Sequence, residues 1–260
     1  MPSRPLRRIA IVGVGLIGGS IGLMARRRLR GVTVTGVDRG AVLRGARRRG
    51  VIDAGATRLG PGLRDADLVV LALPVGAILA ILPRLARHLP AGAMVTDVGS
   101  TKGAILKAAR RAGLASRFVG GHPMAGSERT GVGHADAGLL TGAPWILCPA
   151  GRGAALPFVR RAIRRLGGRP VVMDAGRHDR VVAHLSHLPQ AVSLALALAA
   201  GRGAGRPGRG LAGPAFRQMT RVAESDPALW RGIFRTNEAE TRRALARFER
   251  ELRGIRRTLA

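Results

Sequence analysis

Short apolar runs recur along the first two thirds of the chain, and longer segments with helical spacing lie between them. The runs have the length of buried strands and are bounded by Gly, Pro or charged residues. Such alternation predicts an α/β fold, in which helices cover both faces of a mostly parallel sheet. The expected strands are Ile9–Val12, Val32–Val37, Asp67–Pro74, Ala93–Val98, Arg117–Gly121, Trp145–Pro149 and Pro170–Asp174.

The segments between these runs divide into expected helices and one expected loop. Gly and Pro are frequent from Arg49 to Leu63, which predicts a loop there. Helices are expected after the first strand as far as about Met24, at Ala41–Arg49, at Val75–His88, after Lys102 to about Ala112, and at Leu156–Leu166.

The last third of the chain has only helical patterns, apart from one loop. This change places a domain boundary near residue 175, between an α/β domain at 1–175 and an all-α domain at 176–260. Leu185–Ala200 is apolar nearly all round, so this helix is expected to be buried in a bundle or in a dimer core. Gly201–Gly210 has no periodicity and is predicted to be a flexible interhelical loop, with a short nucleic-acid-binding tail as the alternative.

A glycine triad directly follows the first predicted strand. Gly13 allows a tight turn, Gly15 lets the backbone approach a pyrophosphate, and Gly18 lets helix and sheet pack closely. The helix that follows offers N–H groups and a positive dipole end to the phosphates. Strand, triad, helix and strand in this order predict a Rossmann-type, doubly wound domain. The candidate cofactor-binding residues are Gly13, Gly15, Leu16, Ile17, Gly18, Asp38, Arg39, Leu73, Pro74 and Ser100.

Asp38 ends the second predicted strand, about 20 residues after Gly18. A carboxylate there accepts hydrogen bonds from a ribose 2′-OH and repels a 2′-phosphate, which favours NAD over NADP, although Arg39 weakens this preference a little. Two other interpretations stay open: a glycine-rich helix start that binds nothing, and a signal peptide, since arginines precede the apolar run. Glycines interrupt that run and a second strand follows it at once, which argues against a signal peptide.

Asp38, Pro74, Ser100 and His122 all come at the ends of predicted strands. Ligands bind beyond the carboxyl ends of such strands, so these residues are expected to converge on one crevice. A histidine with an ordinary pKa near ~6.5 can take a proton from an alcohol at neutral pH, which makes His122 the candidate general base, with a structural histidine as the alternative. Ser100 and Lys102 are expected to touch the substrate or the nicotinamide, and Ser100 is also a possible N-cap of the next helix.

The net charge of +29 would normally indicate a nucleic acid or another anionic partner. Only Lys102 and Lys107 are lysines, and the arginines occur in nearly every predicted helix rather than in one block, which favours a compositional bias of the source genome. Aromatic residues that could stack on bases are few, which argues against single-strand binding. The positive field would still attract small anionic substrates.

Cys148, the single cysteine, cannot form an internal disulfide, which fits a reducing cytoplasm. Its apolar surroundings in the sequence indicate a buried structural thiol. No segment has enough uninterrupted apolar length to cross a membrane, and the closest, Ala191–Ala200, is too short. No set of His, Cys, Asp and Glu residues has metal-ligand spacing, so no metal is expected.

The helical part contains two arginines, Arg217 and Arg221, at a spacing that places them on one helical face. Ser225-Asp226-Pro227 is then expected to start a new helix that carries Trp230. Spacing alone leaves each arginine a solvated surface residue.

Five stretches of the chain together resemble the prephenate/arogenate dehydrogenase family, over nearly the whole length. The first stretch is shared by many dehydrogenases, whereas the other four, in this order, are specific. They are Val12–Ser20, Asp97–Lys102, Gly121–Glu128, His178-Asp179 with Ser186–Pro189, and Phe216–Trp230.

The resemblance implies oxidative decarboxylation of a cyclohexadienol on the way to tyrosine, with NAD as hydride acceptor. It implies that His122 removes the proton of the ring hydroxyl while hydride leaves C4, that Ser100 supports both groups, and that Arg221 pairs with the ring carboxylate. It also implies a homodimer formed through the helical domain. Further substrate-binding positions would be Ser127, His187, Gln190, Ser225 and Trp230, the last of which resembles a position that reaches the neighbouring subunit's site.

The chain departs from the family pattern at three places. Gln190 stands where several prephenate-specific members have a histidine, and a neutral amide tolerates both the keto acid of prephenate and the amino acid of arogenate. Gln218 replaces an acidic residue, and Pro214-Ala215 replaces a glycine-rich pair. No added regulatory or mutase domain is expected.

Prephenate oxidation by a cytoplasmic homodimer is the first hypothesis, and an arogenate-preferring or dual-specificity enzyme is the alternative. Another NAD(P)-dependent dehydrogenase of similar architecture and a basic nucleic-acid-binding protein are less favoured.

Overall fold

The computed structural model describes residues 5–127, 129–203 and 211–259. Most of the predicted loop at Gly201–Gly210 lies outside these residues, as does Glu128. The chain divides into two compact units, Met1–His178 and Asp179–Ala260.

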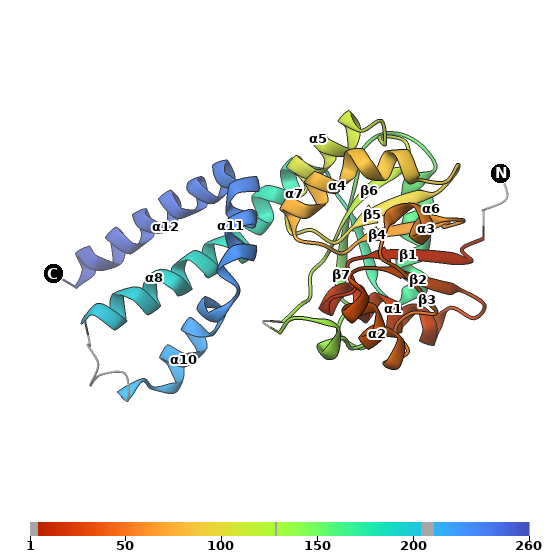
Figure 1. The fold of residues 1–260 in the computed structure, drawn as a ribbon. Helices are drawn as coiled ribbons and strands as arrows, with labels where there is room; N and C mark the ends of the chain where they lie inside the picture. Colours follow the sequence, from red (N-terminus) through yellow and green to blue (C-terminus); the bar gives the residue numbers. More distant parts are fainter. Residues whose placement is uncertain (1–4, 128, 204–210, 260) are drawn as a thin grey trace. The chain divides into compact units, whose positions relative to one another are not determined.

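An eight-stranded sheet forms the centre of the first unit, counted over the described residues. All neighbouring strands are parallel except β6 and β7, which are antiparallel. The α/β fold with a mostly parallel sheet is therefore confirmed (Figure 1). In spatial order the strands are β3 (Ala54–Ala56), β2 (Thr33–Val37), β1 (Arg8–Val12), β4 (Leu68–Leu71), β5 (Met94–Asp97), β6 (Phe118–Pro123), β7 (Pro144–Pro149) and β8 (Arg169–Val172).

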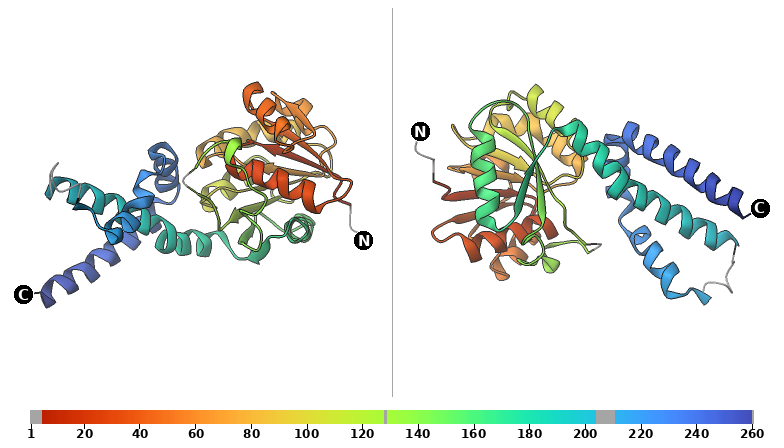
Figure 2. Two further views of the ribbon diagram at one scale, coloured as in Figure 1. Left: turned by 90° about the horizontal axis from the view of Figure 1, so that it is seen from below. Right: turned by 180° about the vertical axis from the view of Figure 1, so that it is seen from behind.

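Helices cover both faces of this sheet, as Figures 1 and 2 show. In β1, Ile9 and Ile11 pack into one apolar core while Ala10 and Val12 pack into the other, because successive side chains of a strand point to opposite faces. Both faces are buried, and this is why the strands read as continuous apolar runs. The first core is closed by α1 (Leu16–Arg28), α2 (Gly40–Arg48) and α6 (Ala155–Leu166), and the second by α3 (Leu59–Leu63), α4 (Val75–His88) and α5 (Gly103–Arg111).

The loop expected from Arg49 to Leu63 is wrong, because this segment contains both β3 and α3. Two of its glycines, Gly55 and Gly62, are closely packed, whereas Gly50, with φ +65°, lies in a turn. A Cβ at Gly62 would lie 2.4 Å from a methyl group of Val37, and one at Gly55 would lie 3.3 Å from the side chain of Leu43. At Gly55 and Gly62, glycine is thus needed because neighbouring side chains leave little room for a Cβ, and not because the chain turns there.

The second unit is helical, as expected. The helical path begins with α7 (Ala175–Val182), whose residues up to His178 belong to the first unit, and passes through a π-helical turn, η2 (Ala183–His187), just before Pro189. Proline lacks the N–H that would bond the carbonyl of Leu185, which accounts for an irregular turn at this place. The path continues with α8 (Leu188–Gly203), α10 (Pro214–Thr220), the 3₁₀ turn η4 (Arg221–Glu224), α11 (Pro227–Thr236) and α12 (Glu238–Thr258).

Helix α8 and the turn before it expose much of their apolar surface. Leu185, Leu194 and Leu198 are 72%, 44% and 53% exposed, and Leu252 and Ile255 of α12 are also exposed. The expectation that this helix is buried in a bundle of its own chain is therefore wrong. The alternative, a dimer core, is compatible with the exposed leucines.

The continuous helical run Ala175–Gly203 is 29 residues long, and one window within it has a mean hydropathy of 1.4. By length and composition alone this helix could cross a membrane, so the expectation that no segment is long enough is wrong. The expectation erred because it counted only the uninterrupted apolar residues and left out the polar turn that precedes them. His178, Asp179 and His187 lie in the first half of the run and are buried in the protein.

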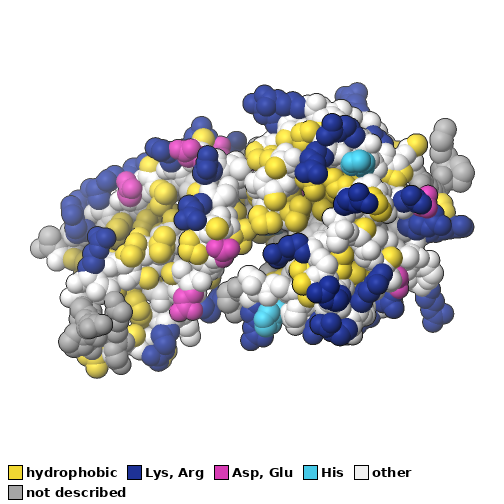
Figure 3. Space-filling view, viewed as in Figure 1, with side chains coloured by type: hydrophobic (Ala, Val, Ile, Leu, Met, Phe, Trp, Pro, Cys, Tyr) yellow, Lys and Arg dark blue, Asp and Glu magenta, His cyan; other side chains and the backbone are white. Residues whose placement is uncertain are grey.

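Basic side chains are scattered over the face drawn in Figure 3, mixed with apolar and neutral surface. They come from many elements; for example, basic residues occupy the last turns of α1, α2, α5 and α6. On this face the charge is therefore distributed, as the sequence predicts, rather than gathered in one stripe.

Two glycine substitutions test the packing of the sheet-bearing unit. We expect Gly22→Ala in α1 to lower the free energy of unfolding by about 1–3 kcal/mol, because the new Cβ would lie 2.5 Å from the carbonyl oxygen of Val51. Gly76→Ala in α4 is the matched control: its Cβ meets nothing within 4 Å, so it should be neutral or stabilising by up to about 1 kcal/mol. Urea unfolding of both variants measures the difference, and equal stability would contradict this account of α1.

Candidate active site

The residues predicted to converge lie at the carboxyl ends of four parallel strands. Asp38 follows β2, Pro74 follows β4, Ser100 follows β5, and His122 lies near the end of β6. Because these strands run the same way in one sheet, the four residues share one edge. The structure differs from the prediction in one detail, since His122 lies within β6, opposite Ile146 of β7, rather than after it.

The glycine-rich turn between β1 and α1 has the predicted geometry. Gly13 has φ +93°, and a Cβ there would lie 2.4 Å from the carbonyl oxygen of Ala72. A Cβ at Gly18 would lie 2.0 Å from the carbonyl oxygen of Gly13, whereas the same position at Gly15 has nothing within 4 Å. The turn therefore has no room for side chains at Gly13 and Gly18, whereas the space around Gly15 is free. Gly15 is the N-cap of α1, and no side chain bonds this helix end. The helix begins at Leu16, so the backbone N–H groups of Leu16 and Ile17 lie in its first turn, at the positive end of the helix dipole.

Asp38 is tied to this turn. Its Oδ2 accepts a hydrogen bond from the backbone N–H of Val14 at 2.8 Å, and its Oδ1 accepts one from Arg39 at 2.7 Å. A carboxylate has about four acceptor positions, so both oxygens can still accept from a ribose hydroxyl. The side chain is half-buried, whereas Arg39 is exposed.

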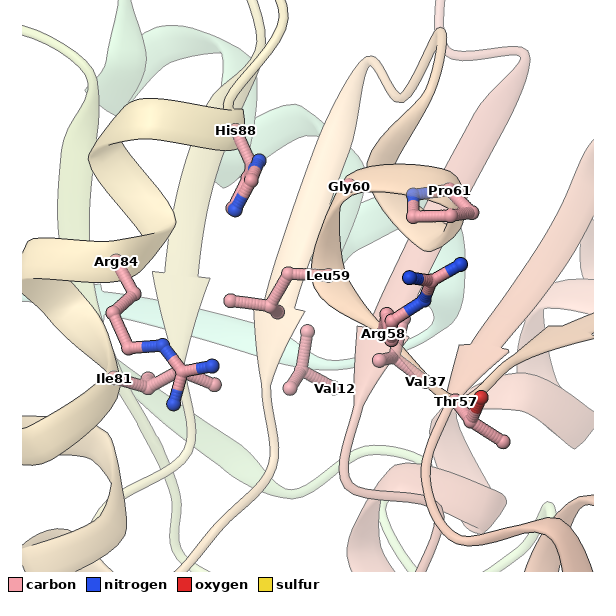
Figure 4. Close-up of a pocket in the computed structure, with 10 residues that line it drawn as sticks. All are labelled: Val12, Val37, Thr57, Arg58, Leu59, Gly60, Pro61, Ile81, Arg84 and His88. Atoms are coloured by element: carbon pink, nitrogen blue, oxygen red, sulfur yellow. The ribbon is translucent and has the colours of Figure 1, made fainter.

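A cavity of about 500 Å³ begins at Val12 and Val37, the last residues of β1 and β2 (Figure 4). It runs between α3 and α4 over an apolar floor, with Arg58 on one side and Arg84 on the other. No pattern in the sequence indicated this cavity, because its wall is the β3–α3 segment, for which a loop was predicted. The remaining lining residues are Thr57, Leu59, Gly60, Pro61, Ile81 and His88.

Lys102 does not face the crevice, contrary to the prediction. It is fully buried and forms an ion pair with Asp97, which is also fully buried. Asp97 accepts from the N–H groups of Gly99 at 2.7 Å and Gly121 at 3.1 Å, and Lys102 donates to the carbonyl oxygen of Gly121 at 2.7 Å. Burial raises the pKa of the Asp97 carboxyl, and Lys102 with the two N–H groups opposes that rise. The pair therefore holds both backbone groups of the residue before His122.

Ser100 lies between β5 and α5, directly after Gly99 of this buried arrangement. The possibility that Ser100 caps the next helix is excluded, since the N-cap of α5 is Lys102 and no side chain caps it. Ser127 is exposed, and its hydroxyl accepts a hydrogen bond from the N–H of Arg129 at 3.1 Å.

His122 contacts a second histidine. Its Nδ1 lies 2.9 Å from Nε2 of His178, and the two rings meet edge to face with centroids 5.1 Å apart. His122 is partly exposed, whereas His178, on α7, is fully buried. The sequence contained a signal for this residue in the His178-Asp179 pair, but nothing in it indicated the contact with His122.

In the helical unit, His187 is fully buried against its own neighbours. Its Nδ1 lies 3.3 Å from Oγ1 of Thr241 and 3.2 Å from Nδ2 of Asn237, and the rings of Trp230 and Phe234 lie edge-on to it. Asn237 in turn donates to the backbone oxygen of Asp179 at 2.7 Å. The polar side chains of this cluster hold the helices together.

Gln190 is also buried, and its amide donates to the backbone oxygen of Val222 at 2.9 Å. Val222 belongs to η4, the turn that begins with Arg221. Arg217 lies in α10, which ends at Thr220, and Arg221 follows as the first residue of η4, so the two arginines belong to successive elements rather than to one helix. Arg221 is exposed at the start of the tighter turn.

The helix start predicted at Ser225-Asp226-Pro227 is confirmed. The Asp226 carboxylate caps α11 by accepting a hydrogen bond from the N–H of Ala228 at 2.8 Å, and Pro227 occupies the first helical position. Ser225 and Trp230 flank this start and are half-buried. Among the described residues, no group of three or more His, Cys, Asp or Glu side chains could hold a metal ion.

Comparison with known proteins finds two adjacent family models. "Prephenate dehydrogenase, nucleotide-binding domain" matches residues 21–172, and "Prephenate dehydrogenase, dimerization domain" matches residues 174–260. A prephenate dehydrogenase of Lactococcus lactis is 32% identical over 252 residues, which cover 95% of this chain and 70% of that protein.

Two solved structures extend the comparison. The A. aeolicus prephenate dehydrogenase in complex with hydroxyphenyl propionate and NAD+ has a TM-score of 0.93 and 33% identity, with 99% of this chain and 92% of that chain covered. The Synechocystis arogenate dehydrogenase has a TM-score of 0.82 and 32% identity, with 97% and 91% covered.

Substitution of the buried lysine tests the ion pair beneath the crevice. We expect Lys102→Met to lower the free energy of unfolding by about 3–5 kcal/mol, because it leaves the Asp97 carboxylate buried without its counter-ion. The double variant Asp97→Asn/Lys102→Met removes both charges and should be less destabilised. Urea unfolding is the measurement, with Lys107→Met, at the only other lysine and an exposed one, as the control. A Lys102→Met variant as stable as this control would contradict the role of the pair.

Proposed function

Because the chain belongs to the prephenate dehydrogenase family, we propose that it oxidises prephenate with NAD and releases CO2, a step of tyrosine biosynthesis. The observation that carries this proposal is the shared sheet edge, where the glycine-rich turn, Asp38, Ser100 and His122 come together. Oxidation of an alcohol by a bound dinucleotide requires the groups that hold the cofactor, the turn and Asp38, to lie close to the groups that contact the hydroxyl, Ser100 and His122.

In the proposed reaction, His122 acts as the general base. It accepts the proton of the ring C4 hydroxyl while hydride leaves C4 for NAD, and Ser100 supports the same hydroxyl by hydrogen bonding. The C1–carboxylate bond then breaks and CO2 departs, while the electrons of that bond pass through the ring to the C4 oxygen, which takes the proton back from His122. The product is a phenol, and the aromatic ring makes the step effectively irreversible.

For the cofactor, we propose that Gly13, Gly15 and Gly18 cradle the pyrophosphate at the start of α1, with Leu16 and Ile17 as N–H donors. Asp38 would bind the ribose of NAD and disfavour NADP, with Arg39 beside it. Leu73 and Pro74, which follow β4, would line the same crevice. The cavity of Figure 4 begins next to Asp38 and has the apolar floor that an adenine ring needs.

The helical unit would supply the ligand of the ring carboxylate. We propose Arg221 for this role, since a guanidinium forms two parallel hydrogen bonds with a carboxylate. Gln190 supports the role indirectly by holding the turn that begins with Arg221. Ser127, His187, Ser225 and Trp230 stay candidate pocket residues, and His187 also contacts Thr241, Asn237, Trp230 and Phe234 of the helical unit.

Charge favours prephenate over arogenate as the substrate. Prephenate carries two carboxylates, whereas the side chain of arogenate adds an ammonium group to its own carboxylate. A chain with a net charge of +29 attracts the more anionic ring compound more strongly. Gln190 is neutral, so it opposes neither substrate, and arogenate or dual specificity is the alternative.

We also propose a cytoplasmic homodimer formed through the helical unit. The matching family model is described as a dimerization domain, and the exposed leucines of α8 and α12 are an apolar surface that a second copy would cover.

A direct assay tests the substrate. Purified protein is mixed with NAD, and the absorbance of reduced nicotinamide is followed with prephenate in one cell and arogenate in another. We expect turnover with both substrates or with prephenate alone, and a higher kcat/KM for prephenate at low salt. If no reduced nicotinamide forms with either substrate, with NAD or with NADP in its place, the proposed reaction is contradicted.

Two substitutions test separately the general base proposed at His122 and the carboxylate ligand proposed at Arg221. We expect His122→Asn to lower kcat by about 10²–10⁴-fold with little change in the KM for NAD. Arg221→Ala should lower kcat/KM for prephenate by about 10–100-fold, the loss of a charge-assisted hydrogen bond. Circular dichroism checks that both variants fold, and Arg253→Ala, at an exposed arginine of α12, serves as the charge control. Full activity in both variants would contradict the roles proposed for His122 and Arg221.

A further inference from the structure

His178 is a fully buried histidine to which the proposed chemistry assigns no part. Its Nε2 lies 2.9 Å from Nδ1 of His122, a hydrogen-bond distance. Neither residue is close to the other in the sequence: His122 comes from β6 and His178 from α7, and both lie in the sheet-bearing unit. Packing of β6 and α7 thus brings the ring of His178 to the Nδ1 side of His122.

We propose that His178 is a positioning residue, which accepts a hydrogen bond from Nδ1–H of His122 and thereby keeps the lone pair of His122 on Nε2. This inference rests on the proposed function, because it concerns the general base of that reaction.

The two ring nitrogens of a histidine have different roles when the ring is neutral. A neutral histidine carries one N–H, and the hydrogen bond made by one nitrogen decides which of them is protonated. If Nδ1 of His122 donates to His178, then Nε2 is the nitrogen that can accept a proton from an alcohol. The opposite arrangement, in which His178 donates, would place the proton of His122 on Nε2 and remove its basic nitrogen from the substrate.

The hydrogen bond also assists the proton transfer itself. When Nε2 of His122 takes the hydroxyl proton, the ring becomes positively charged and its Nδ1–H becomes a stronger donor. In this arrangement His178 acts only as the hydrogen-bond acceptor. The arrangement resembles a catalytic dyad with a neutral acceptor in place of a carboxylate.

Both partners are held in place. The backbone of Gly121, next to His122, is fixed by Asp97 and Lys102. His178 lies in the first turn of α7, where its N–H donates to the backbone oxygen of Asp174 at 3.0 Å, and its side chain is fully buried. A side chain fixed in this way loses little conformational freedom when it orients its neighbour.

A matched pair of substitutions tests the acceptor. The amide of glutamine reaches about as far as Nε2 of histidine, whereas the amide of asparagine ends near the position of Nδ1. We therefore expect His178→Gln to keep kcat within about threefold, because its amide oxygen can accept from His122. His178→Asn should lower kcat by about 10-fold or more, part of the ~10²–10⁴-fold that a positioned base contributes. The KM for NAD should change in neither variant.

Nuclear magnetic resonance of the ¹⁵N-labelled chain tests the tautomer without relying on activity. The chain has six histidines, and the signals of His122 are identified by their loss in His122→Asn. At a pH where the ring is neutral, we expect two-bond ¹H–¹⁵N correlations to show the proton of His122 on Nδ1 in the wild type and in His178→Gln, and a shift towards Nε2–H in His178→Asn.

Two results would overturn the inference: a wild-type His122 protonated on Nε2, or a His178→Asn variant with unchanged kcat and an unchanged His122 spectrum. The spectrum can be recorded whether or not the protein oxidises prephenate. Failure of the proposed function and failure of the role of His178 are therefore distinguishable.

Discussion

The buried ion pair between Asp97 and Lys102 links strand β5, the loop between β5 and α5, and strand β6. The candidate site depends on the relative positions of these three segments. Taking two charges out of water costs several kcal/mol for each ion, and a hydrophobic pair of similar volume would avoid that cost. Here, however, the charged atoms also bind the N–H of Gly99 and both backbone groups of Gly121. A hydrophobic pair would leave these groups buried without partners. The ion pair thus fixes the loop that carries Ser100 and the strand that carries His122 at the same time.

Local patterns revealed most of the fold, because a sheet buried on both faces produces long apolar runs and its helices produce clear periodicity. Contacts between distant residues were not visible in these patterns. Glycines of the β3–α3 segment indicated a loop, yet Gly62 is required by Val37 on a neighbouring strand. Lys102 appeared to be a site residue, since nothing in the sequence pairs it with Asp97. The contact between His122 and His178 depends on how β6 and α7 pack, which no spacing encodes.

The two units use their buried polar groups differently. In the sheet-bearing unit, Asp97 and Lys102 bind the backbone of the residue before His122, and His178 contacts the His122 ring itself. In the helical unit, Gln190 and Asn237 bind backbone oxygens, those of Val222 and Asp179. A substitution at Gln190 is therefore expected to act first on the turn that begins with Arg221, the residue proposed to bind the ring carboxylate.

The double attachment of Asp38 limits how this lineage can change its cofactor. A move to the phosphorylated dinucleotide would require loss of the carboxylate, and a small neutral residue is the usual replacement. That same step would remove the acceptor of the Val14 N–H and loosen the glycine-rich turn. The first mutation towards a new cofactor would thus weaken binding of both dinucleotides. Selection would have to repair the turn before a new preference could be of advantage, so the preference proposed for Asp38 would be protected by the hydrogen bond that Asp38 makes to the turn.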